Sequence, residues 1–165
     1  MEVISEELVD ESRQEVAMFN TSRITKGIKE LSKQQPHLLS FMLELTKDLD
    51  LEVRELSVYI FYNVYRMFKL GYQKRINKIS SKDIIGCYED NEKFIESLDG
   101  THDKLLERIT GIQVSEQPYV MKYVVDTLVE VPEDEYPIEL SKEDAGYLFL
   151  LLKTVIDLLN KTTNI

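Results

Sequence analysis

The sequence is poor in cysteine: Cys87 is the single one among 165 residues. One cysteine cannot close an intramolecular disulfide, and it cannot supply the several thiolates of a structural zinc site. Reduced thiols are typical of intracellular proteins, so we expect a cytoplasmic location. The acidic start, MEVISEELVDESRQEV, agrees with this expectation because it resembles neither a secretory signal nor a transit peptide.

Long apolar runs and catalytic signatures are also missing. The uncharged run Tyr147–Leu152 is much shorter than the roughly 20 residues of a membrane span, so we expect no membrane partner. The sequence contains no Gly-rich phosphate loop, no Gly-x-Ser-x-Gly elbow, no His-Glu-x-x-His and no pair of Glu-x-x-His motifs. We therefore assign no catalytic residue and no cofactor, and we favour a protein that is not an enzyme.

A metal site is nevertheless one interpretation of Asp99, His102 and Asp103, which bring an imidazole and two carboxylates together at a helix start. Zinc and non-haem iron both use such ligands. The alternative is that Asp99 or Thr101 caps a helix and that His102 is a solvated first-turn residue. The metal interpretation belongs to a second functional hypothesis, in which the chain is a small-molecule- or metal-binding helical protein, with an enzyme included in that class.

Cys87 raises another chemical hypothesis, in which it pairs with a histidine and acts as a nucleophile. Its neighbours Ile84, Ile85 and Tyr88 favour instead a buried structural thiol.

Two acidic groups are candidate sites for a cation or a basic partner. They are the stripe Glu89, Glu92 and Glu96, and the loop 132–140, which contains two prolines and four carboxylates. Like charges at these spacings repel one another and are cheaply screened by water, so solvated surface is the favoured interpretation of both. The proline-flanked loop is the better partner site of the two.

The formal net charge of −10 disfavours nucleic acid and anionic membranes as partners. The charge is unevenly distributed, because no Asp or Glu occurs between Leu56 and Lys82. The cations of this segment are Arg66, Lys69, Lys74, Arg75, Lys78 and Lys82. We therefore expect the molecule to be electrically two-sided.

The composition, 43% hydrophobic and 30% charged residues, predicts a folded chain, and its length favours a single domain, 1–165. Apolar residues recur at three- and four-residue intervals, which predicts an all-α, mostly antiparallel bundle of six to eight helices. The predicted helices span 3–19, 22–34, 36–49, 50–79, 81–98, 101–111, 118–131 and 141–161. The valines of 118–131 leave a strand as the alternative there.

The segments 50–79 and 141–161 are predicted to form the centre of the bundle. Asp50 occupies the N-cap position of the first, which carries an apolar stripe on one helical face. The stripe consists of Val58, Phe61, Tyr65, Phe68, Tyr72 and Ile79. Apolar residues cover most of the circumference of 141–161, so we expect this helix to be the most enclosed and to pack against 50–79.

A second face of the 50–79 segment combines aromatic and cationic side chains. We name it the Tyr/Arg/Lys face, and its residues are Tyr59, Tyr62, Arg66, Lys69, Lys74 and Arg75. Such mixtures are enriched at protein interfaces and in nucleic-acid stacking sites. The alternative is a second packing face whose tyrosine hydroxyls reach the solvent. We predict that this face binds a protein partner or a second copy of the chain, with nucleic acid the weaker hypothesis.

Overall fold

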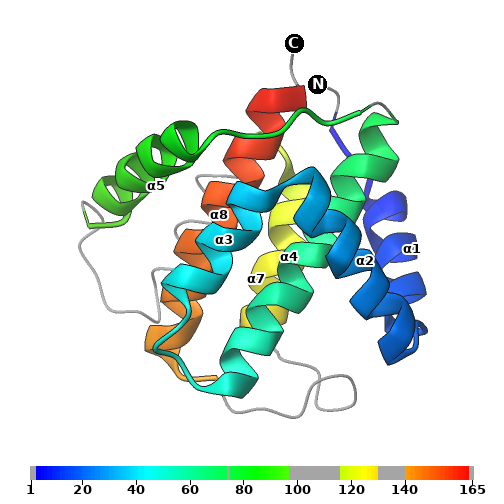
Figure 1. The fold of residues 1–165 in the computed structure, drawn as a ribbon, viewed down its shortest axis with the longest axis horizontal. Helices are drawn as coiled ribbons and strands as arrows, with labels where there is room; N and C mark the ends of the chain where they lie inside the picture. Colours follow the sequence, from blue (N-terminus) through cyan, green and yellow to red (C-terminus); the bar gives the residue numbers. More distant parts are fainter. Residues whose placement is uncertain (1–2, 74, 97–115, 130–139, 164–165) are drawn as a thin grey trace.

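The computed structural model describes residues 3–73, 75–96, 116–129 and 140–163. These residues form an all-helical bundle without strands, which confirms the predicted fold class (Figure 1). The described helices are α1 (Glu6–Ala17), α2 (Thr21–Gln34), α3 (Pro36–Leu45), α4 (Leu51–Tyr72), α5 (Ser81–Glu96), α7 (Pro118–Val129) and α8 (Lys142–Thr163). The helix predicted for 101–111 and the acidic loop 132–140 lie outside the described residues, apart from Leu140.

The bundle is organised around α4 and α8, as the sequence predicts. α4 packs against α1, α2, α3, α7 and α8, and α8 packs in addition against α5 and α7. Phe61 and Phe68 of α4 and Phe149 of α8 are completely buried between these helices and their neighbours. α8 has 13 buried residues and α4 has 10, so α8 is the more enclosed of the two.

The predicted 50–79 helix is wrong at its C-terminal end, because α4 stops at Tyr72. Gln73 adopts a left-handed conformation (φ 56°) and its N–H donates to the carbonyl of Lys69, which terminates the helix. Residues 75–80 form neither helix nor strand and cross the bundle towards α5 (Figure 1). Ile79 is therefore buried, as predicted, but it is not a helical residue.

A buried glutamine holds the segment that follows α4. The Gln35 side chain donates from Nε2 to the carbonyl of Asn77 (2.8 Å) and accepts from the N–H of Ile79 (3.0 Å). These bonds satisfy backbone groups that a helix would satisfy internally, and Ile76 and Ile79 enter the core. The partners are 42 and 44 residues apart, so helical periodicity within 50–79 carries no trace of them.

The other boundaries follow local signals. The side chains of Asn20, Ser80 and Ser141 each accept from a backbone N–H three residues on, which caps α2, α5 and α8. Asp50 occupies the N-cap position of α4, as predicted, but its side chain makes no cap hydrogen bond. α3 ends at Leu45 rather than at the predicted Leu49. Directly after Leu45, the Thr46 hydroxyl donates to the carbonyl of Met42. The valine-rich segment after Pro118 is helical, which excludes the strand alternative over the described part, 118–129. In the described helices, no stretch is long and apolar enough to cross a bilayer.

Candidate functional site

The Tyr/Arg/Lys face divides into residues that contact α1 and α2 and residues beyond the end of α4. Tyr59 and Tyr62 are half-buried, and Lys69 is exposed. Arg75 is exposed in the segment after the helix, and Lys74 lies outside the described residues. The structure therefore brings the first four members together on the side of α4 that α1 and α2 cover.

Arg66 joins α4 to α1. Its guanidinium donates to the hydroxyl of Ser12 (2.8 Å) and forms an ion pair with Glu15. Its side chain is 19% exposed, and its Cζ lies 5.4 Å from the centre of the Phe19 ring. Arg66 therefore packs α4 against α1. This role corresponds to the alternative interpretation, in which this side of the helix is a packing face.

Tyr62 contacts α2 at a glycine. A Cβ atom on Gly27 would lie 2.6 Å from the Tyr62 hydroxyl oxygen, so the missing side chain makes room for the tyrosine ring. Glycine inside a helix costs about 1 kcal/mol relative to alanine. At this cost in helix stability, the missing side chain of Gly27 allows close contact between α2 and the Tyr62 ring.

The two ends of α2 differ in how closely they approach α4. Near the C-terminal end, Leu31 is buried, and the amide oxygen of Gln34 accepts from the Tyr65 hydroxyl (3.1 Å) and from Lys69 Nζ (3.2 Å). Near the N-terminal end, Ile24 and Ile28 are half-buried. α2 is therefore fixed at one end and stands away from α4 at the other.

An open groove of about 820 Å³ lies between α2 and α4 at the N-terminal end of α2. We name it the α2–α4 groove, and its apolar walls are formed by Ile24 and Ile28 of α2, Leu43 of α3, and Leu51, Val58 and Tyr59 of α4. Leu51 is 66% exposed and Leu43 is 40% exposed, although both are large apolar residues. The groove thus presents uncovered hydrophobic surface to the solvent.

Cations border this groove. A neighbouring hollow of about 530 Å³ shares Phe19 with it and contains Arg23, Lys26 and Arg66, which we name the basic rim. Arg23 Cζ lies 3.8 Å from the centre of the Phe19 ring, a cation–π distance. Arg54 lines the groove itself, and its buried Nε has no hydrogen-bond acceptor among the described residues.

Sequence reasoning identified one wall of this site and missed the other. Tyr59 and the cation Arg66 belong to the predicted face, whereas no residue of α2 was among the predicted site residues. The available signal was the basic character of α2, where four cations accompany the single acid Glu30. These cations are Arg23, Lys26, Lys29 and Lys33.

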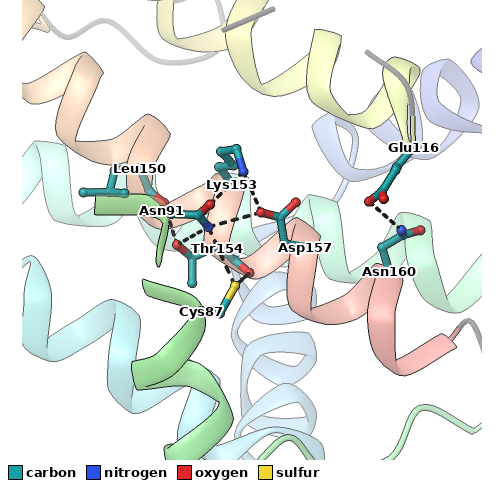
Figure 2. Close-up of polar contacts among 8 residues, drawn as sticks. All are labelled: Cys87, Asn91, Glu116, Leu150, Lys153, Thr154, Asp157 and Asn160. Atoms are coloured by element: carbon teal, nitrogen blue, oxygen red, sulfur yellow. Dashed lines mark hydrogen bonds and ion pairs between the residues drawn. The ribbon is translucent and has the colours of Figure 1, made fainter. Parts of the chain in front are cut away.

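A different chemistry occurs between α5 and α8 (Figure 2). Lys153 is 5% exposed and donates to Asn91 Oδ1 (2.7 Å) and Asp157 Oδ2 (2.7 Å). The amide of Asn91 donates in turn to the Thr154 hydroxyl and to Asp157 Oδ2, each at 3.1 Å. We name this group, together with Cys87, the α5–α8 polar cluster. Its buried polar atoms are paired with one another, so the cluster is a structural link between α5 and α8.

Cys87 lies at the edge of the α5–α8 polar cluster, with Sγ 3.9 Å from the carbonyl oxygen of Thr154. Burial, followed by the nearby charge of Asp157, raises the pKa of the thiol to about 11 from its ordinary 9.0. A nucleophilic cysteine requires the opposite change, because the thiolate is the reactive form. This environment agrees with a structural thiol.

The remaining candidate residues are dispersed. The metal candidates Asp99, His102 and Asp103 lie outside the described residues. Within the described residues, no cluster of three or more His, Cys, Asp or Glu side chains is placed to hold a metal ion. The stripe Glu89, Glu92 and Glu96 is exposed on α5.

Comparison of this chain with protein-family models, with curated proteins and with solved structures finds no match.

Proposed function

We propose that this chain is a non-enzymatic interaction protein that binds a protein partner through the α2–α4 groove and its basic rim. The observation that carries the proposal is the exposure of Leu43 and Leu51 at an open apolar groove. Apolar residues in such positions, bordered by cations and aromatic rings, are typical of protein interfaces. The Tyr/Arg/Lys face contributes Tyr59 and Arg66 to this surface.

Protein is favoured over nucleic acid by the balance of the surface. Nucleic-acid sites depend on phosphate neutralisation, and they place cations along the whole contact. Here the cations border a groove whose walls are mainly aliphatic, within a chain of net charge −10. A cytoplasmic location belongs to the same proposal, because Cys87 is a free thiol.

The proposal is tested by site-specific photo-crosslinking in cells. A photo-reactive phenylalanine analogue at Leu51 is expected to give a discrete crosslinked product that mass spectrometry identifies. The matched control is Ile85 of α5, which is also a large exposed apolar residue (56%) but does not line the groove. In Figure 1, α5 lies on the other side of the bundle from α2. Equal crosslinking from both positions, or none from Leu51, would contradict the proposal.

Self-association is distinguished by the mass of the crosslinked product and by native mass spectrometry of the purified chain. Charge reversal at Arg66 is a poor test, because Arg66 holds α1 through Ser12 and Glu15. Leu51→Glu tests binding directly, since Leu51 is largely uncovered.

A further inference from the structure

We infer that the α2–α4 groove binds an acidic amphipathic helix from another protein. This inference rests on the proposed function and adds the chemical class of the partner. Three features of the groove support it: the helical form of its walls, the exposure of its lip and the charge around it.

The walls of the groove are rows of side chains on two helices. Ile24 and Ile28 are four residues apart on α2, and Leu51, Glu55 and Val58 follow one another at four- and three-residue intervals on α4. Rows at these intervals form the ridges between which a ridge of a third helix packs. Helix-in-groove recognition uses anchors at the same i, i+3, i+4 and i+7 spacing. The shape therefore suits a helix with one apolar stripe.

The exposed edge of the groove, formed by Leu43 and Leu51, favours a helix over a small molecule as the occupant. The volume of about 820 Å³ lies within the range of roughly 300–1,000 Å³ found for small-ligand sites. Such sites enclose most of their ligand, whereas this groove leaves Leu51 66% exposed at its edge. An occupant that covers Leu51 and Leu43 must extend beyond the cavity, as a helix does.

The charges of the side chains around the groove determine the charge expected of the partner helix. α2 carries four cations and one acid, a net charge of +3 in a chain of −10. Arg54 and Glu55 both line the groove, so their charges offset each other, and Glu30 lies among the cations of the basic rim. Arg66 is paired with Glu15. Arg23 and Lys26, which form no ion pair among the described contacts, are therefore the cations that remain for a partner. Acidic residues flanking the apolar stripe of the partner would complement these cations and accelerate association.

A second copy of the chain fits the groove poorly. A two-fold symmetric dimer through this surface would bring two copies of the basic rim into one interface, where their like charges disfavour association. The acidic helix α1 has five acids and one arginine, a net charge of −4, but its apolar residues Val9 and Val16 are buried in its own bundle. The partner is therefore a helix from a different protein.

The experiment is selection from a display library of helical peptides of about 18 residues, roughly five turns. Leucine is held at the i, i+3, i+4 and i+7 stripe positions, and all other positions vary among Glu, Gln, Ala and Lys. Selection on the intact chain is expected to enrich peptides with net negative charge. Selection on the double variant Arg23→Glu, Lys26→Glu is expected to shift enrichment towards positive charge, because the rim is then acidic.

Two controls locate the binding. The variant Lys82→Glu, Lys93→Glu removes as many cations from α5 and is expected to select the same acidic peptides as the original chain. Leu51→Glu is expected to weaken a selected peptide by about 10-fold or more in fluorescence anisotropy, because it replaces an apolar contact with a charge that repels an acidic peptide. Among the described residues, the side chains of Arg23 and Lys26 form no hydrogen bond or ion pair, although Arg23 lies over the Phe19 ring. Arg23→Glu places an acid in the first turn of α2, where it favours the helix.

The inference is overturned if selection enriches neutral or basic peptides, enriches nothing, or responds equally to the α5 charge reversal. These failures differ from failure of the proposed function. A partner crosslinked at Leu51 that presents a loop or a basic segment would retain the interaction surface and reject the acidic helix. Absence of any Leu51 crosslink would reject the surface itself.

Discussion

Two outer helices, α5 and α2, pack on the central pair in different ways. α5 lies on α8 and buries Ile84 and Asn91, whereas α2 lies beside α4 and buries Leu31 alone. The α5–α8 interface is closed by a polar cluster. The α2–α4 interface is close at Gly27 and opens into the groove beside Ile24 and Ile28. An outer helix can thus be held either along its length or at one end.

The difference shows how burial and binding compete for the same apolar residues. At the α5–α8 interface, polar atoms leave water and bond to one another, which fixes how the two helices lie against each other. At the α2–α4 interface, Ile24 and Ile28 remain half-buried, and the uncovered area is available to a partner. Changes in the closed interface should therefore reduce stability, and changes in the open groove should reduce binding.

The largest effect expected from changing a polar side chain is at Asp157. Asp157→Ala removes the carboxylate that Lys153 contacts at 2.7 Å and leaves the buried ammonium with Asn91 as its remaining hydrogen-bond partner. Breaking one side of a buried ion pair costs about 3 kcal/mol in the free energy of unfolding. Urea denaturation measures this loss. Asp157→Asn keeps an oxygen acceptor and should lose less; equal losses would show that the charge is unimportant.

A smaller loss is expected at Gln35, which follows the fixed end of α2. Gln35→Ala leaves the N–H of Ile79 and the carbonyl of Asn77 without their partner, which costs about 2 kcal/mol. The control is Gln34→Ala, because Gln34 is exposed and should contribute less than about 1 kcal/mol. Thermal or urea unfolding of both variants tests the difference, and a larger loss at Gln34 would contradict it.

The closed interface should also respond to alkaline pH through Cys87. Its folded pKa of about 11 exceeds the ordinary 9.0, so the folded state favours the neutral thiol. The resulting stability is fully present below pH 9 and is lost as pH rises from 9 to 11. Comparison with Cys87→Ala at pH 8 and pH 10.5 isolates this contribution.

The same pKa predicts slow alkylation. Near neutral pH the thiolate fraction of Cys87 is about 100-fold lower than that of a thiol with a pKa of 9.0. Iodoacetamide should therefore react with Cys87 much more slowly than with a reference peptide, and faster in urea. Equal rates for the folded chain and the peptide would show that the interface does not protect the thiol.

The smallest effect on stability is expected in the groove. Leu51→Glu should change the free energy of unfolding by no more than about 0.5 kcal/mol, because its side chain is largely in solvent. Leu56→Ala on the same helix is the contrast, since Leu56 is 1% exposed and its truncation should cost about 2–5 kcal/mol. A large loss for Leu51→Glu would mean that the groove is closed in solution.

Much of the fold was accessible from local sequence patterns. Caps such as Asn20 and Ser141 act within three residues, and the apolar periodicity of α4 and α8 repeats within one or two turns. These signals identified the described helices and the central pair. They failed after Tyr72, where Gln35, far away in the chain, bonds the backbone of Asn77 and Ile79.

The candidate site was only partly accessible for the same reason. Residues Tyr59, Tyr62, Arg66 and Lys69 share a side of α4 by helical spacing alone, so the sequence placed them together. Whether that side faces solvent or another helix depends on contacts with α1 and α2. Arg66 became a packing residue through Ser12 and Glu15, which are 54 and 51 residues away.

By itself, then, the sequence determined where the described helices lie along the chain and which side of each is apolar, because backbone hydrogen bonds and caps operate over a few residues. The tertiary structure alone decided where α4 ends, how α5 closes on α8 and where α2 leaves a groove. Those outcomes depend on which distant side chains meet, and on whether each apolar row finds a neighbour or remains in contact with water.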